Sequence, residues 1–177
     1  MPHTLTRKLY LVRHAEPERT DALLGRADVA LSTGGKLQAS AALRELRAEI
    51  IYSSPLRRAI ETAKRIPLLV PVEILPELAE ITYGKWDGKP WSEIEAKDGE
   101  LARRKLQDWY AVTPPGGEEW SAFSRRVTRA LEVILNGPFP AIVVAHAGVN
   151  AEIAWQMAGV ERARFSQNYC QVLEYEL

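Results

Sequence analysis

Two short apolar segments of this chain each end on a histidine. Lys8–Val12 leads into Arg13-His14, and Ala141–Ala145 leads into His146. Short apolar runs with branched side chains are typical of buried strands. In an open α/β sheet, ligands bind just outside the carboxyl ends of the strands. The sequence therefore predicts two imidazoles, one of them beside an arginine, at the edge where such a sheet would hold an anion.

Strand-like and helix-like segments alternate along the chain, which indicates an α/β fold with a mostly parallel sheet. The predicted strands are Leu9–Val12, Glu49–Tyr52, Val72–Leu75, Ala141–Ala145 and, as an edge strand, Val172–Tyr175. The predicted helices are Lys36–Ala48 capped by Ser32 or Thr33, a helix opened by Ser54-Pro55 and stopped by Pro67, Trp91–Val112 with a break near Gly99, Glu118–Leu135 with acidic residues in its first turn, and Gly148–Ala158. Glu77–Pro90 is predicted to be a loop, and residues 90–114 a helical insertion that covers the pocket.

The composition limits the class of protein. The 177 residues suit a single domain, residues 1–177, and 23 basic residues balance 23 acidic ones, so we expect neither a nucleic-acid nor a membrane-surface partner. A single cysteine, Cys170, excludes an internal disulfide and favours a reducing compartment. Met1–Leu11 lacks the apolar core of a signal peptide, and the apolar runs are shorter than the ~20 residues that span a bilayer. We therefore expect a cytoplasmic protein.

Arg13-His14 is the first candidate for chemistry. An arginine offers a planar fork of donors that matches phosphate oxygens, and a neutral imidazole is a competent nucleophile toward phosphorus. A strand end can hold the ring rigidly, with one nitrogen on a backbone carbonyl and the other free. Taken alone, this pair is more often a capping arginine and a histidine with purely structural hydrogen bonds.

Ser54–Ala59 is the second candidate, because it opens a helix directly after a strand, and a helix N-terminus binds anions. Arg57 and Arg58 point in different directions on a helix, so we expect at most one of them to face the pocket, and a surface pair of cations is the alternative. His146-Ala147-Gly148 repeats the strand–histidine arrangement, and its small residues would let backbone N–H groups approach an oxyanion.

Glu77–Gly84 supplies a carboxyl group. Cleavage of a phosphate ester needs a proton donor for the leaving oxygen, and partial burial raises the pKa of a carboxyl so that it keeps its proton near neutrality. An exposed loop carboxylate is the alternative. Gly34-Gly35-Lys36 does not complete a nucleotide phosphate loop, and no metal-binding histidine spacing occurs, so we expect no metal and no other cofactor.

Taken together, these segments resemble the histidine phosphatase (phosphoglycerate mutase-like) superfamily, in family order and over nearly the whole chain. Leu11–Glu16 resembles its L-[VI]-R-H-G-E segment, Leu24–Ala39 its G-x-x-D-x-x-L-[TS]-x-x-G-x-x-Q-A stretch, Ser53–Ala63 its S-S-x-L-x-R-A-x-x-T-A stretch, Leu78–Gly88 its L-x-E-x-x-[YF]-G-x-W-[ED]-G stretch, Pro115–Glu118 its P-G-G-E and His146–Gly148 its H-G-G. The resemblance implies a three-layer α/β/α sandwich.

The resemblance also implies roles. His14 is expected to be phosphorylated during turnover, Arg13, Arg58 and His146 to hold the phosphoryl oxygens, and Glu80 to protonate the leaving group. Four positions depart from the family pattern. Ala15 and Ala147 stand where the family has glycine, which narrows the pocket floor but is expected to keep the N–H donors. Thr20 stands where many members have asparagine, and Ala151 where many phosphatases have arginine. Thr20 and Ala147 complete the expected substrate contacts.

Hydrolysis is favoured over mutase-type phosphotransfer, because true mutases carry long extra segments that exclude water. The expected substrate is a small phosphomonoester, with α-ribazole 5′-phosphate as one candidate. A catalytically silent member that binds phosphorylated ligands is the alternative from another class. Trp86, Trp91 and Trp109 would either stack on an aromatic substrate or belong to the core. A monomer is expected, or a homodimer paired through Val172–Tyr175.

Overall fold

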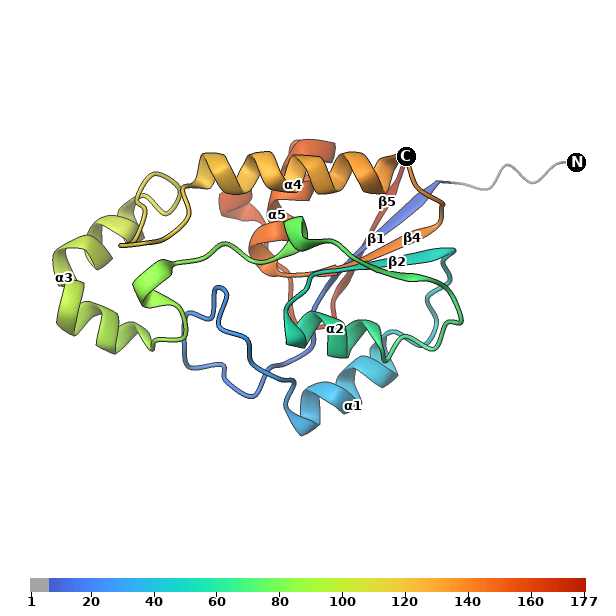
Figure 1. Cartoon of the computed structure of the whole chain (residues 1–177), viewed down its shortest axis with the longest axis horizontal. Coiled ribbons are helices and arrows are strands. Elements are labelled where there is room, and N and C mark those ends of the chain that lie inside the picture. Colours follow the sequence, from blue (N-terminus) through green and yellow to red (C-terminus); the bar gives the residue numbers. More distant parts are fainter. Residues whose placement is uncertain (1–6) are drawn as a thin grey trace, which may run out of the picture.

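Residues 7–177, which the computed structural model describes, are built around one five-stranded sheet (Figure 1). Residues 1–6, with His3 and the first half of Met1–Leu11, lie outside the described residues. The strands are β1 (Lys8–Arg13), β2 (Ile50–Ser53), β3 (Val72–Ile74), β4 (Ala141–Ala145) and β5 (Val172–Glu176). Their order in the sheet is β3-β2-β4-β1-β5. Only β5 runs antiparallel to its neighbour, so the predicted mostly parallel sheet is confirmed.

The register of the central strands brings the two histidines together. Arg13 at the end of β1 lies opposite Ala145 at the end of β4. The ladder continues past both strand ends, because the backbone N–H of His14 donates to the carbonyl of Ala145 over 2.9 Å. Parallel neighbours end at the same edge of the sheet, so the residues that follow them meet there.

Helices cover both faces of the sheet. Helices α1 (Thr33–Ala42) and α2 (Arg57–Ala63) pack on one face, where Val12, Ile51, Ile142 and Val144 point. Helices α4 (Trp120–Leu135) and α5 (Ala147–Ala158) pack on the other face with Leu9, Leu11, Tyr52 and Val143. The alternation of side chains along each strand gives both cores. This arrangement is the predicted three-layer α/β/α sandwich (Figure 1).

The predicted helical insertion forms α3 (Trp91–Gln107), which lies at the end of the molecule away from the sheet (Figure 1). Its break falls at Asp98, where the backbone leaves helical geometry and the carboxylate accepts a 2.7 Å hydrogen bond from the buried indole of Trp86. The predicted loop before α3 holds two short 3-10 turns, Pro76–Leu78 and Gly84–Trp86, and a third turn, Arg162–Arg164, follows α5.

Three predicted helix boundaries differ from the structure. Helix α1 ends at Ala42, because Leu43 turns into the core. Helix α2 begins at Arg57 rather than at Pro55, because the hydroxyl of Ser54 bonds a histidine instead of serving as N-cap. Helix α4 begins at Trp120, so the acidic residues predicted for its first turn precede it, and one of them, Glu118, is paired with Arg126.

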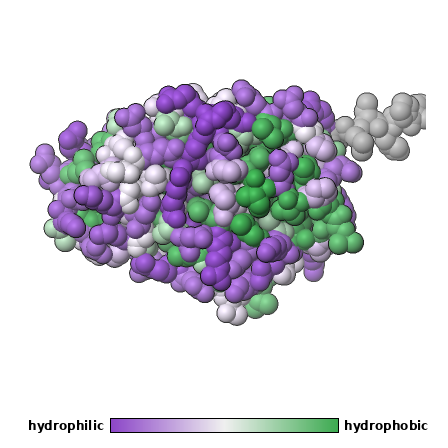
Figure 2. Space-filling view, viewed as in Figure 1, coloured by the Kyte–Doolittle hydropathy of each residue, from purple (hydrophilic) through white to green (hydrophobic). Residues whose placement is uncertain are grey.

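The two edges of the sheet differ in chemistry. Strand β3 is exposed along its length, and Leu69, Val72 and Ile74 make an apolar patch that is visible where β3 crosses the view in Figure 2. At the β5 edge, Lys8 pairs with Glu174 and Glu176. The β3 edge is therefore the more apolar of the two, and the dimer that we predicted to pair through the edge strand Val172–Tyr175 stays a prediction. Between residues 7 and 177, no helix combines the length and the apolar character needed to cross a bilayer.

Candidate active site

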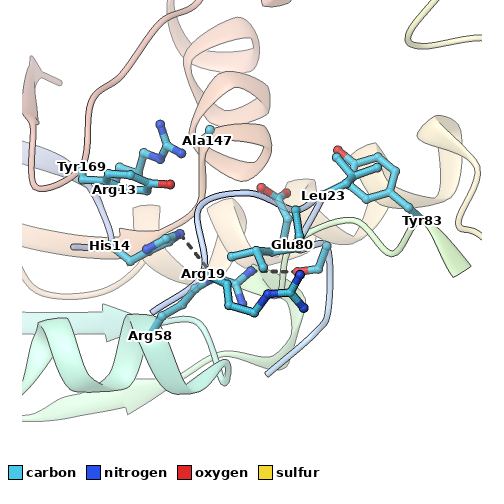
Figure 3. A pocket seen from close by; sticks show the side chains of 12 residues that line it. Arg13, His14, Arg19, Leu23, Arg58, Glu80, Tyr83, Ala147 and Tyr169 are labelled. Carbon is cyan, nitrogen blue, oxygen red and sulfur yellow. Dashed lines mark hydrogen bonds between the residues drawn. The ribbon is translucent and has the colours of Figure 1, made fainter. Parts of the chain in front are cut away.

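A pocket of about 180 Å³ opens at the sheet edge where β1 and β4 end. Its lining consists of Arg13, His14, Arg19, Ala22, Leu23, Leu24, Gly25, Arg58, Glu80, Tyr83, Ala147 and Tyr169. In Figure 3, His14, Arg13 and Tyr169 lie on one side of the pocket, and Glu80, Leu23 and Tyr83 on the other. Three guanidinium groups face a single carboxyl group, so the pocket suits an anion.

His14 is held with one ring nitrogen free of hydrogen. Its Nδ1 lies 2.7 Å from the carbonyl oxygen of Ala15, which can only accept, so Nδ1 carries the proton. Nε2 then accepts a 3.2 Å hydrogen bond from Nε of Arg58. Burial and the nearby Arg58 and Arg13 charges lower the pKa of His14 from 6.5 to about 3, so the ring is neutral at physiological pH. The Nε2 lone pair is therefore available to attack an electrophile.

Arg58 is fixed by backbone carbonyls of the loop between β1 and α1. The same loop also contacts the first residue of α2, the helix that carries Arg58. The Arg58 guanidinium donates to the carbonyls of Ala27 at 2.8 Å and Gly25 at 2.7 Å. Asp28 of the same loop accepts from the backbone N–H of Arg57 at the start of α2. The Arg57 side chain turns outward to pair with Glu61, whereas Arg58 is 1% exposed. One of the two arginines thus faces the pocket, as the helical geometry predicts.

His146 lies behind His14, with their ring centroids 5.2 Å apart. Its Nε2 is 2.7 Å from Oγ of Ser54, and that oxygen also accepts from the backbone N–H of Leu56. The Ser54 hydroxyl can accept from Leu56 and still donate its proton to Nε2, and in that arrangement the proton of the neutral His146 ring lies on Nδ1. Nδ1 of His146 and Nε of Arg13 have no hydrogen-bond partner among the described residues. These two buried donors are available to an anion.

Glu80 is placed by two backbone N–H groups. Its carboxylate oxygens accept from Ile81 at 3.0 Å and from Gly148 at 3.1 Å. Burial raises the pKa of Glu80, although these hydrogen bonds and the nearby arginines act in the opposite direction. A Cβ atom at Gly148 would lie 2.5 Å from Oε1 of Glu80, so any other residue here would displace the carboxylate from this position. Glu80 is thus a carboxyl group that can hold a proton beside the pocket.

The loop that carries Glu80 is held by hydrogen bonds from Arg126, a residue that the sequence did not single out. Arg126 donates to the carbonyls of Glu77, Ala79 and Glu80. Two hydrogen bonds of 2.7 and 2.8 Å join it to Glu118, the last residue of the P-G-G-E motif. The signal in the sequence was an arginine on the apolar face of α4, three residues after the buried Phe123.

Tyr169 and Arg19 are lining residues that the sequence did not single out. The Tyr169 ring lies 5.5 Å from the His14 ring, and the guanidinium carbon of Arg13 lies 4.1 Å from the Tyr169 centroid. The side chain of Arg13 also donates to the carbonyl of Gln167 at 2.7 Å. Tyr169 therefore covers the nucleophile candidate and orients its neighbouring arginine.

The structure brings most of the predicted site residues together. His14, Arg13, Arg58, Glu80 and Ala147 line the pocket, and His146 lies buried behind it. Thr20 does not: it is exposed, and its neighbour Arg19 reaches the pocket instead.

Other expectations about the pocket are corrected. The backbone N–H of Ala15 is taken by Thr62, and that of Gly148 by Glu80, so neither is free for an oxyanion. Trp86 and Trp91 belong to the core. The insertion α3 contributes no lining residue to this pocket.

Among residues 7–177, no cluster of three His, Cys, Asp or Glu side chains could hold a metal ion.

Relatives of the chain share this fold and carry phosphatase names. This chain is 32% identical over 179 residues to Phosphoserine phosphatase 1 of Hydrogenobacter thermophilus, and the match covers 96% of this chain and 85% of that protein. It is 30% identical over 162 residues to the adenosylcobalamin/α-ribazole phosphatase of Escherichia coli K12, covering 86% and 80%. The crystal structure of the α-ribazole phosphatase from Shigella flexneri superposes with a TM-score of 0.85 at 25% identity, covering 94% of this chain and 89% of that one.

Other relatives are longer proteins. Against Bifunctional protein Rv2228c of Mycobacterium tuberculosis the chain is 34% identical over 149 residues, which is 78% of this chain and 41% of that protein. The chain thus spans about two fifths of that relative's length.

The family model described as the histidine phosphatase superfamily (branch 1) matches residues 9–176. The fold, the pocket and these matches agree, and the chain belongs to the histidine phosphatase superfamily.

Proposed function

We propose that this protein is a metal-independent phosphomonoester hydrolase that works through a phosphohistidine intermediate. The observation that carries the proposal is the state of His14. Its ring is neutral, Nδ1 is anchored on a carbonyl, and Nε2 faces Arg58 in a pocket that also holds one carboxyl group of raised pKa. A fixed lone pair, an adjacent cation and a proton donor are what phosphoryl transfer requires.

In the first step, Nε2 of His14 attacks phosphorus in line, the N–P bond forms, and the bond from phosphorus to the ester oxygen breaks. Glu80 gives its proton to the departing alkoxide. Arg58, Arg13 and Nδ1–H of His146 neutralise the equatorial oxygens, where charge spreads. Arginine and imidazole donors supply the positive charge, so no step needs a metal ion.

In the second step, the Glu80 carboxylate takes a proton from water as the water oxygen attacks phosphorus. The N–P bond breaks, inorganic phosphate leaves, and Glu80 is again protonated for the next cycle. The same carboxyl group acts first as acid and then as base, which suits a pKa raised toward neutrality.

The substrate we propose is a small phosphomonoester, and α-ribazole 5′-phosphate is the first compound to test. Two relatives carry the α-ribazole phosphatase name, one through sequence and one through structure. A third relative is named for phosphoserine, so the names alone do not select a substrate.

The test is hydrolysis of p-nitrophenyl phosphate in the presence of EDTA, by the wild type and by His14→Ala. We expect colour release by the wild type, and a loss of about 10⁴-fold or more in the variant, because the nucleophile is gone. Intact mass after a brief reaction should show one added phosphoryl group on the wild type alone. His14→Ala with retained turnover would remove His14 from the mechanism. A requirement for added divalent metal would refute metal independence, and phosphate binding without turnover would identify a silent member.

A further inference from the structure

A second hollow adjoins the candidate active site and shares Arg13 and Ala147 with it. Its volume is about 300 Å³. It is lined by Arg13, Trp109, Tyr110, Trp120, Ala147, Gly148, Ala151, Arg162, Phe165, Ser166, Gln167 and Asn168. Ligand pockets typically measure about 300–1,000 Å³, so the first pocket alone, at about 180 Å³, suits a phosphoryl group and little else. The rest of a substrate needs space such as this hollow.

Glu80, the proposed acid, lies at the border between the active-site pocket and the second hollow. Glu80 lines the first pocket, and its carboxylate accepts from the backbone N–H of Gly148, which lines the second. The oxygen that Glu80 protonates is the one that joins the phosphoryl group to the leaving group. A leaving group that departs past Glu80 therefore has the second hollow beside it.

The walls of the second hollow are aromatic. Trp109, Tyr110, Trp120 and Phe165 contribute rings, and the Tyr110 and Trp120 rings meet edge to face with centroids 4.6 Å apart. Part of the lining consists of small residues that leave the hollow unfilled, namely Ala147, Gly148 and Ala151. Flat ligand rings pack well against aromatic side chains, and small residues leave room for them.

The charge of the lining is one-sided. Arg13 and Arg162 are its charged residues, and neither aspartate nor glutamate belongs to this lining. Arg162 is fixed by Glu152, which is fully buried and also accepts from Ser124 and from the Trp120 indole. The hollow is thus held in shape before any ligand arrives, and it offers a cationic ligand group no carboxylate.

From these observations we infer that the second hollow is the leaving-group subsite, and that it takes a flat aromatic ring that is neutral or anionic. The inference rests on the proposed phosphatase function and names its substrate class. An aliphatic leaving group would leave the rings uncovered, and a leaving group with an ammonium would meet two guanidinium groups.

Two substrates that differ only in the ring test the inference. Adenosine 5′-phosphate and ribose 5-phosphate share the reacting ester, and adenosine adds a flat neutral base. We expect the wild type to show a kcat/KM at least about ten-fold higher for adenosine 5′-phosphate, which is the range of stacking on aromatic side chains. O-Phosphoethanolamine, whose leaving group carries an ammonium and no carboxylate, should be hydrolysed with a lower kcat/KM than ribose 5-phosphate.

Ala151→Leu fills the hollow from α5 and should bring the ratio of kcat/KM for adenosine 5′-phosphate to that for ribose 5-phosphate down toward one. Ala158→Leu is the matched control, because Ala158 lies on the same helix, is exposed and is absent from the lining. If Ala151→Leu fails to fold, Phe165→Ala removes one ring from the wall and should lower the same ratio.

The outcomes separate the two proposals. Equal kcat/KM for adenosine 5′-phosphate and ribose 5-phosphate in the wild type overturns the subsite while the phosphatase stands. A fall of both substrates together in Ala151→Leu and Phe165→Ala does the same. Absence of hydrolysis of every ester, p-nitrophenyl phosphate included, refutes the phosphatase itself.

Discussion

The two ends of the candidate site are built in different ways. At the phosphate end, His14 and His146 follow strand ends, Arg58 lies in the first turn of a helix, and these side chains are 4%, 1% and 1% exposed. At the leaving-group end, Trp109 and Tyr110 follow α3 and Phe165 precedes β5, and all three are half-buried.

The difference shows where chemistry and selectivity reside. Backbone carbonyls of Ala15, Gly25 and Ala27 hold the side chains of the phosphate end, so their geometry follows from the fold itself. The rings of the other end are carried largely by connecting segments, which can change without loss of the sheet. Substitutions at the phosphate end should therefore change the rate of chemistry, and those at the other end the choice of substrate.

Glu80→Gln should have the largest effect. The comparison uses kcat/KM, which reports the phosphorylation step and not the later attack of water. The amide cannot donate the proton, so kcat/KM for an alkyl ester such as ribose 5-phosphate should fall by about 10²–10⁴-fold. The kcat/KM for p-nitrophenyl phosphate should fall much less, since its leaving group departs without a proton. Glu77→Gln is the control: it changes the neighbouring glutamate, whose side chain lies outside the pocket lining. Equal losses for both esters would contradict the role of Glu80 as acid.

Acid should destabilise the protein through its phosphate end. The pKa of His14 is lowered to about 3 and that of His146 well below its usual value, both mainly by burial. Between pH 6.5 and those values the unfolded chain binds protons that the folded chain refuses, so stability falls as the pH falls. The raised pKa of Glu80 acts in the opposite direction within the same interval, above the usual carboxyl pKa of 4.5.

Urea unfolding at pH 7 and pH 4.5 measures this effect. The wild type should lose stability over that interval, with about 2 kcal/mol of the loss due to His14, so His14→Gln should lose about 2 kcal/mol less than the wild type. The second hollow has no histidine in its lining, so Ala151→Leu should follow the wild-type pH dependence. If the His14→Gln and wild-type losses are the same, the acid sensitivity lies elsewhere.

Gly148→Ala probes the border between the two ends and should have the smallest effect. The added Cβ would lie 2.5 Å from Oε1 of Glu80, so the carboxylate must move by several tenths of an ångström. We expect kcat to drop by about ten-fold for alkyl esters, because a misplaced acid transfers its proton less efficiently. Gly99→Ala, in α3 with nothing within 4 Å of the added atom, should leave kcat unchanged. An unaltered kcat in Gly148→Ala would show that the position of Glu80 is tolerant.

The fold and the phosphate end could be predicted because their signals are local. A buried strand followed by histidine places that histidine at the sheet edge, and His14 after β1 and His146 after β4 both lie there. The mostly parallel α/β sheet followed from the alternation of elements, and the three-layer sandwich from the resemblance to the family. The loop between β1 and α1 was less predictable: Thr20, the expected contact, is exposed, and Arg19 lines the pocket in its place.

The sequence by itself determined the sheet and the two histidines, because strand and helix periodicities and residue types are properties of short segments, and its resemblance to the family selected Arg58 over Arg57. Only the tertiary structure decided which carbonyls Arg126 holds, that Tyr169 covers His14, and that two guanidinium groups and four rings enclose a second hollow. These contacts join segments far apart in the chain: Arg126 reaches Ala79 across 47 residues, and Tyr169 packs on a strand end near residue 14. Such pairings arise from how the layers pack together, which no local pattern of residues records.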